Sequence, residues 1–181
     1  MIGVHVAQLL KAPVGATRSD EFSEDEPELR TELGLRGPIV GSVKVTRTTH
    51  GILADVQYRA EITQECGRCL GDAENVVENR FRQEFLPTTN IQTGLPESIP
   101  ADPDEPRIGA DHIIDLTETI RQDIVLEQPL RPLCRPDCAG LCEVCGTDLN
   151  ETACGHAVHD GEDEQPLGRL GELLKSKLPP T

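Results

Sequence analysis

Aromatic residues are scarce in this chain of 181 residues, which has three Phe, one Tyr and no Trp. A hydrophobic core must therefore come almost wholly from Val, Ile, Leu and Ala, without the large burial that aromatic rings supply. Hydrophobic residues make up 36% of the sequence, which is low for a globular protein of this length. A bound metal ion would compensate, because metal binding adds directly to the free energy of folding.

Basic residues and long apolar runs are also in short supply. The chain has 17 Lys and Arg against 32 Asp and Glu, so its formal net charge is −15. Affinity for phosphate backbones depends on Lys and Arg, so this balance argues against a simple electrostatic nucleic-acid binder. No stretch approaches the run of about 18 apolar residues that spans a membrane, and the first ten residues lack the charged start of a signal peptide. We expect a cytoplasmic protein with no membrane partner and no small-molecule substrate.

Cysteine, by contrast, occurs in a clear pattern. A C-x-x-C pair lies in residues 66–69, and a denser cysteine run begins at Cys134. The odd number of cysteines, seven, and their tight spacing argue against a secreted disulfide framework. Pairs at this spacing are typical of tetrahedral zinc sites, so we expect one or two structural zinc ions. The candidate ligands are Cys66, Cys69, Cys134, Cys138, Cys142, Cys145, Cys154 and His156.

These eight candidates can be grouped in two ways. In the first grouping, the four cysteines in residues 134–145 form one local site, and the remaining four candidates form the other. In the second, the pair in residues 66–69 joins the cysteines at 134 and 138, and the rest form a compact ribbon-like finger. We favour the second grouping, in which a metal ion links the predicted strand to the segment after the predicted helix. His159 is an alternative to His156 in the finger.

A structural role for zinc is favoured over a catalytic one. Protein ligands can fill all four positions of each site, and no H-E-x-x-H or H-x-E arrangement supplies a base. The pair in residues 66–69 alone could be a thioredoxin-like redox pair, but such a pair begins a helix in a βαβ unit. Arg68, Arg131 and Arg135 would lie near the first site, either as a small RNA- or protein-contacting patch or as ordinary solvated side chains.

Alternation of apolar and polar residues predicts the clearest part of the fold. Residues 54–62 alternate strictly, after a strand over 40–48 and before a third strand over 73–86. The first cysteine pair then lies in the connection between two strands. Gly67 allows the unusual backbone angles that a metal-binding turn requires.

Two helices are predicted near the C-terminus. Asp115 and Glu118 look like a capping box, and the helix that follows should end before Pro129. A last helix can begin at Pro166, after an acidic break over 160–164.

We therefore expect one α+β domain over residues 1–181, with an antiparallel, partly barrel-like sheet, peripheral helices and a zinc-binding C-terminal element. Its expected parts are 1–38 (a short strand over 4–10 and an acidic loop over 18–32), 39–86 (the β-hairpin, the third strand and the first cysteine pair), 87–110 (a linker), 111–159 (a helix and the zinc-binding cysteine cluster) and 160–181 (the acidic break and the C-terminal helix).

Three motifs carry a resemblance to a known family. They are C-x-R-C-L after the hairpin (66–70), the cysteine run over 133–142, and the finger segment 145–150, which ends in Asp-Leu-Asn. Together they resemble the YceD family, the large ribosomal RNA subunit accumulation proteins, over most of the chain. The chain departs from that pattern at His156, where similar bacterial members have a second cysteine, and at Glu143, where proline is common.

The resemblance implies a non-enzymatic ribosome-biogenesis factor that is needed for accumulation of large-subunit ribosomal RNA. The acidity favours a basic ribosomal protein or a large-subunit assembly intermediate as partner, with only indirect or local contact to ribosomal RNA. Two other functions stay open: a zinc-ribbon interaction module in transcription or regulation, and a thiol redox or metal-dependent enzyme. Association with large-subunit precursors rather than RNA polymerase separates the first two, and a closed site with unreactive thiols argues against the enzyme.

Overall fold

The computed structural model describes residues 1–91, 93–96 and 106–156, which fall into two compact units. Unit 1 comprises Met1–Gly67 and Gly71–Pro136, and unit 2 comprises Arg68–Leu70 and the chain from Asp137 onward. That residues 1–181 form one domain stays a prediction.

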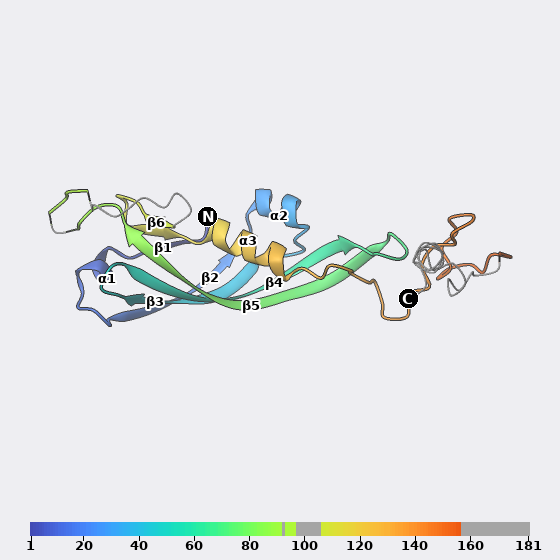
Figure 1. The fold of residues 1–181 in the computed structure, drawn as a ribbon, viewed down its shortest axis with the longest axis horizontal. Helices are drawn as coiled ribbons and strands as arrows, with labels where there is room; N and C mark the ends of the chain where they lie inside the picture. Colours follow the sequence, from blue (N-terminus) through green and yellow to red (C-terminus); the bar gives the residue numbers. More distant parts are fainter. Residues whose placement is uncertain (92, 97–105, 157–181) are drawn as a thin grey trace, which may run out of the picture. The chain divides into compact units, whose positions relative to one another are not determined.

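The named helices and strands of the described residues all lie in unit 1 and make it an α+β structure, as expected (Figure 1). The strands are β1 (Gly3–His5), β2 (Thr17–Glu24), β3 (Ile39–Arg47), β4 (Ile52–Glu65), β5 (Asp72–Pro87), β6 (Arg107–Ile108) and β7 (Ile113–Asp115). The helices are α1 (Ala7–Lys11), α2 (Pro27–Leu33) and α3 (Thr117–Glu127). Among the described residues, no helix is both long and apolar enough to cross a membrane.

The main sheet has five strands in the order β2-β3-β4-β5-β6. All its pairs are antiparallel except β5–β6, and β1 pairs with β7 in a separate two-stranded sheet. The three central strands were predicted correctly, because β3, β4 and β5 bury alternate residues. The expected partly barrel-like closure is not supported. The sheet is open, because β2 and β6 are its two edges in the described part of the chain.

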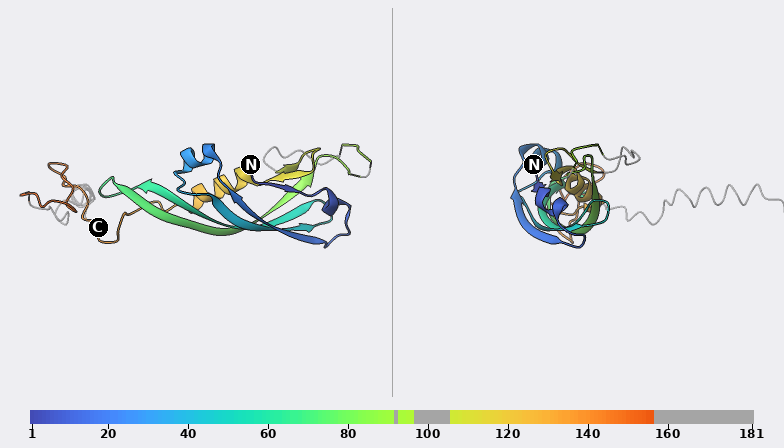
Figure 2. Two further views of the ribbon diagram at one scale, coloured as in Figure 1. Left: turned by 180° about the vertical axis from the view of Figure 1, so that it is seen from behind. Right: turned by 90° about the vertical axis from the view of Figure 1, so that its left-hand side faces the viewer.

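Strands β4 and β5 extend well beyond β3. The β3–β4 pairing stops at Arg59, whereas β4 and β5 stay paired as far as Glu65 and Asp72. Figures 1 and 2 show this extension as a long two-stranded arm. The arm leads directly into the turn that contains the first cysteine pair, as the alternation predicts.

Helix α3 packs its apolar side against the buried face of the sheet. Ile120 and Ile124 are fully buried, and the Tyr58 hydroxyl of β4 donates a 2.6 Å hydrogen bond to Asp123 Oδ2. The helix ends at Glu127, before Pro129, as expected. The capping box is wrong, because Leu116 occupies the cap position and the Glu118 carboxylate pairs with Arg121.

The N-terminal expectations need correction. The strand expected over 4–10 is the short strand β1 followed by α1, whose Leu9 and Leu10 are buried. The acidic loop expected over 18–32 is strand β2 and helix α2. Strand β2 tolerates polar residues because it is an edge strand. Helix α2 carries sequence signals that composition obscured, namely Pro27 in its first turn and Gly34 at its left-handed C-cap.

Several predicted features fall partly or wholly outside the described residues. The linker expected over 87–110 contains β6, but its residues 92 and 97–105 are not described. His159, the acidic break over 160–164 and the helix expected from Pro166 also lie outside the described residues.

Candidate metal centre

The eight predicted ligands fall into two groups of four, and within each group the ligand atoms lie within 4.8 Å of one another. The first group is Cys66, Cys69, Cys134 and Cys138, and the second is Cys142, Cys145, Cys154 and His156. This is the second of the two groupings considered from the sequence. None of the seven cysteines, all of which are described, forms a disulfide.

The end of the β4–β5 arm determines the position of Cys66, a member of the first group. Its backbone N–H donates to the Gly71 carbonyl at 2.7 Å, which closes the turn between the two strands. The Gly67 N–H donates to the Pro132 carbonyl at 2.8 Å, so unit 1 holds the segment before Cys134 beside this turn. The left-handed backbone of the turn falls on Leu70, with φ 60°, and not on Gly67 as expected.

Arg68 organises the segment around Cys138 in unit 2. Its guanidinium donates to the Cys138 carbonyl at 2.8 Å, and its own carbonyl accepts the Leu141 N–H at 3.1 Å. Gly140 passes close to this carbonyl with φ 78°, and a Cβ there would lie 3.1 Å from the Arg68 oxygen. Both the close approach and the left-handed conformation therefore favour glycine at this position.

Asn150 is a second-layer residue to which the sequence reasoning gave no role. Its Oδ1 accepts the Ala139 N–H at 2.7 Å, which fixes the orientation of the amide. Its Nδ2 then donates to Cys138 Sγ at 3.4 Å and to Asp148 Oδ1 at 2.6 Å. Donors to a ligating sulfur stabilise the thiolate form. The signal was present in the sequence, because Asn150 closes the Asp-Leu-Asn motif.

The second group is built on a tight loop of unit 2. The Cys142 N–H donates to the Thr147 carbonyl at 2.9 Å, and the Gly146 N–H donates to the Cys142 carbonyl at 2.8 Å. Gly146 has φ 71°, which lets the chain reverse directly after Cys145.

Two of the three thiols in this group, those of Cys142 and Cys145, are favoured in the thiolate form, whereas the pKa of Cys154 is raised. The backbone N–H groups of Cys145 and Val144 point at Cys142 Sγ and lower the pKa of that thiol from 9.0 to about 7. The Thr147 hydroxyl lies 3.2 Å from Cys145 Sγ and lowers the pKa of Cys145. His156 Nδ1 lies 3.8 Å from Cys142 Sγ, close to the ligand spacing of about 3.8 Å in a tetrahedron with bonds of about 2.3 Å.

The donor sets of both groups fit a metal ion. Each offers four soft or borderline ligands, Cys₄ in the first and Cys₃His in the second, and both sets are typical of structural zinc. The two cysteine-rich clusters could thus hold metal ions and are compatible with zinc. Such an ion would hold chain segments together, because four protein ligands fill a tetrahedral site and leave no position for a substrate.

Comparison with known proteins identifies one family that this chain resembles. Residues 54–174 match the family model described as large ribosomal RNA subunit accumulation protein YceD. This region contains both cysteine groups.

Curated relatives also match, although the chain spans only about half to two thirds of their length. An uncharacterized Mycobacterium tuberculosis protein is 32% identical over 107 residues, which cover 59% of this chain and 49% of that protein. An uncharacterized Mycobacterium leprae protein is 30% identical over 149 residues, which cover 80% of this chain and 63% of that one. A Zea mays protein named as a chloroplastic homologue of the large ribosomal RNA subunit accumulation protein YCED is 31% identical, covering 74% of this chain and 57% of that one. No solved structure matches significantly.

Proposed function

Because this chain belongs to the YceD family, we propose that it is a non-enzymatic ribosome-biogenesis factor that supports the accumulation of large-subunit ribosomal RNA. The observation that carries this proposal is the family match over residues 54–174, which spans the β4–β5 arm and both cysteine groups. The name of the Zea mays relative points to the same role for that protein.

Zinc at both cysteine groups would serve this role as a structural element. The first ion would be held by Cys66, Cys69, Cys134 and Cys138, and the second by Cys142, Cys145, Cys154 and His156. Backbone and side-chain donors around Cys138, Cys142 and Cys145 support thiolate ligation. Filled ligand sets also support the non-enzymatic assignment, since catalytic zinc keeps an open position.

The partner that we propose is a ribosomal protein or a large-subunit assembly intermediate, bound in the cytoplasm. A net charge of −15 favours association with a basic protein surface and disfavours extensive coating of naked RNA. Recovery of the protein on RNA alone in high salt would contradict this choice of partner.

The proposal is tested by depleting the protein from the cells that produce it and measuring mature and precursor ribosomal RNA of both subunits. We expect selective loss of large-subunit RNA, with rescue by the wild-type gene. The double variant Cys142→Ser/Cys145→Ser should fail to rescue, because it loses two ligands of one site. Val144→Ser is the matched control, because Val144 lies between those ligands with a side chain that is 67% exposed.

An unchanged ratio of large- to small-subunit RNA after depletion would overturn the proposal. If the protein then co-purified with RNA polymerase and not with subunit precursors, the transcriptional zinc-ribbon function would replace it.

A further inference from the structure

The outward face of the main sheet carries a cluster of basic side chains on an otherwise acidic molecule. Antiparallel register sets these side chains in rows across β2, β3, β4 and β5. One row is Ser19–Lys44–Asp55–Arg82, and the next is Glu21–Ser42–Gln57–Arg80. Lys44, Arg80 and Arg82 thus surround one carboxylate, that of Asp55. These two rows hold three positive charges, on Lys44, Arg80 and Arg82, and two negative charges, on Glu21 and Asp55, a local excess of one on a chain of net charge −15.

Asp55 holds the two arginines in place and leaves part of each guanidinium available. Its carboxylate accepts from Arg80 Nε at 2.6 Å and Nη2 at 2.8 Å, and from Arg82 Nε at 2.9 Å. Within the described residues, neither Nη atom of Arg82 makes a hydrogen bond, and the Lys44 ammonium makes no hydrogen bond or ion pair. Both arginines are exposed, whereas the Asp55 side chain is only 14% exposed. Arginines oriented in advance in this way are suited to bidentate binding of phosphate oxygens.

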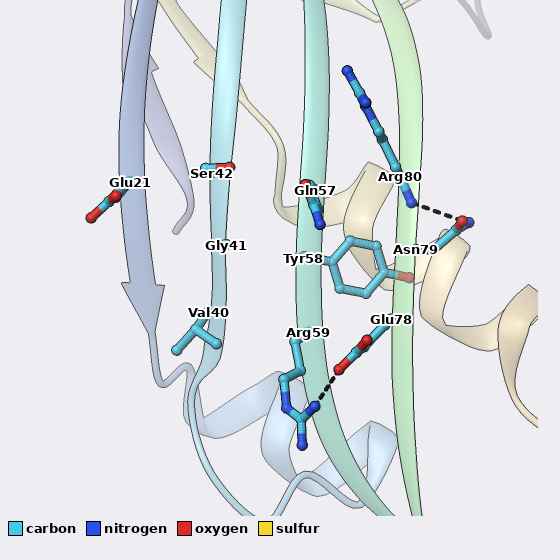
Figure 3. A pocket seen from close by; sticks show the side chains of 10 residues that line it. All are labelled: Glu21, Val40, Gly41, Ser42, Gln57, Tyr58, Arg59, Glu78, Asn79 and Arg80. Carbon is cyan, nitrogen blue, oxygen red and sulfur yellow. Dashed lines mark hydrogen bonds and ion pairs between the residues drawn. The ribbon is translucent and has the colours of Figure 1, made fainter.

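A hollow of about 710 Å³ adjoins this cluster on the same face. Figure 3 shows Ser42, Gln57 and Arg80 side by side across β3, β4 and β5 among its lining residues, which also include Glu21 and the ion pair of Arg59 with Glu78. The exposed Ser42 hydroxyl and Gln57 amide add neutral hydrogen-bonding groups beside the cations.

The chemistry of this face points to a nucleic-acid backbone and not to bases. The chain's aromatic residues, Phe22, Tyr58, Phe81 and Phe85, all belong to the opposite, core-facing side of the sheet. Tyr58 borders the hollow, but its side chain is buried and its hydroxyl donates to Asp123. The outward face therefore has no exposed ring for base stacking, which single-strand binders use. Recognition of the backbone of an A-form duplex depends on phosphate contacts instead, and the basic cluster can make such contacts.

We propose that Lys44, Arg80 and Arg82, with Ser42 and Gln57, bind the phosphate backbone of double-stranded RNA. This deepens the proposed function and rests on it, because the duplex would belong to the ribosomal RNA of the assembly intermediate. Glu21, Glu78 and Glu84 border the cluster and confine the contact to about two or three phosphates. Binding is then weak alone and sequence-independent, in the non-specific range of Kd, about 10⁻⁴ to 10⁻⁶ M. An acidic chain with such a small basic contact would engage RNA only together with a protein partner.

The test measures binding of the full chain to a fluorescent RNA duplex of about 16 base pairs at several salt concentrations. Lys44→Gln/Arg82→Gln should weaken binding about tenfold at low salt and reduce the salt slope by about two. Lys11→Gln/Arg30→Gln is the matched control, because it changes the net charge equally on α1 and α2, away from this face.

Equal weakening by the two double variants would overturn the inference. So would binding of an oligoglutamate peptide in preference to RNA, which would assign the face to an acidic protein segment. Lys44→Gln alone guards against misfolding, since within the described residues Lys44 has no ion-pair partner to lose. If depletion selectively lowers large-subunit RNA, Lys44→Gln/Arg82→Gln rescues that loss and the wild-type chain does not bind the duplex, this inference is rejected. The proposed function would then remain intact.

Discussion

Unit 1 and unit 2 differ in what lies inside them. Unit 1 buries aliphatic side chains from its sheets and from all three helices, and many of them are completely inaccessible. In the described residues of unit 2, the buried ones are Cys138, Gly140 and Cys142. One unit has the apolar burial that drives folding, and the other, as far as it is described, has almost none.

This difference assigns different sources of stability to the two units. Small chains without a sufficient core generally need disulfides, metal ions or a partner to fold. The cysteines of unit 2 form no disulfide, but its loop presents a complete Cys₃His set. We therefore expect unit 2 to depend on metal and unit 1 to depend on packing, and each prediction below tests that division.

The largest effect should follow from removing metal from the second group. Structural zinc sites contribute an apparent binding free energy of about 10–16 kcal/mol, which a small unit without an apolar core cannot replace. Chelation or Cys142→Ser should abolish protection of the Cys142 and Gly146 amides, which hydrogen bond within the loop. Amide hydrogen exchange by NMR, with zinc content by mass spectrometry, measures this.

Val144→Ser is the control for that experiment and should retain both zinc and amide protection. The main sheet should keep its slow-exchanging amides throughout. Persistent protection of the Cys142 and Gly146 amides without metal would contradict the expected dependence of unit 2 on metal, because other interactions would then hold this loop.

A truncation in the core should destabilise unit 1 and leave unit 2 unchanged, and its effect should be smaller than that of removing metal. Ile120→Ala removes a fully buried side chain from α3 and should destabilise unit 1 by about 2–5 kcal/mol. Thermal unfolding by circular dichroism measures the loss, and zinc content should not change. Val125→Ala on the same helix is the control, because Val125 is 47% exposed and its truncation should change stability by less than about 0.5 kcal/mol. Equal losses for the two variants would mean that burial on α3 does not set the stability of unit 1.

The central hairpin could be predicted, and the grouping of the candidate ligands could be proposed, because both depend on local pattern. Alternation from Ala54 to Ile62 fixes which side of β4 is buried, and paired cysteine spacing selects ligands that one turn can present. The N-terminal elements were less accessible, because β2 is stabilised by its register with β3 and not by its own composition. Its polar, acidic sequence is typical of a loop unless a neighbouring strand is known.

Residues that support the candidate ligands were also hard to predict. Asn150 acts on Cys138, twelve positions earlier in the sequence, and only the loop geometry brings its amide to the sulfur. The capping box failed for a related reason. The Glu118 carboxylate accepts hydrogen bonds from Arg121, one helical turn ahead, at 2.8 and 2.7 Å, and makes no cap hydrogen bond.

A polar contact inside unit 1 tests whether packing alone holds α3. Tyr58→Phe keeps the buried ring but removes the hydroxyl that donates to Asp123. We expect a loss of about 1–2 kcal/mol in the free energy of unfolding, because a hydrogen bond to a charged group is lost. The same substitution in an Asp123→Asn background should cost less, and this double-mutant cycle isolates the contact. An equal loss in both backgrounds would assign the effect to ring packing instead.

The smallest effect on stability should come from the ion pairs of Asp55 on the outward face of the sheet. Its pH dependence distinguishes unit 1 from unit 2. Hydrogen bonds from Arg80, and then from Arg82, lower the pKa of Asp55 from 3.8 to about 2 in the folded protein. A depressed carboxylate pKa stabilises the fold above the unfolded value, and this stability is lost as pH falls through the folded value.

Wild type should therefore exceed Asp55→Asn in the free energy of unfolding of unit 1 by at most about 1 kcal/mol above pH 4. The difference should shrink as pH falls below 4 and vanish below about pH 2, and it should also vanish in an Arg80→Gln/Arg82→Gln background. Denaturant unfolding across this pH range measures it. Unit 2 should respond at higher pH, because metal leaves as protons compete for the thiolates. Acid would then separate a metal-dependent unit from one held by packing, whereas simultaneous loss of both units would show that their stabilities are coupled.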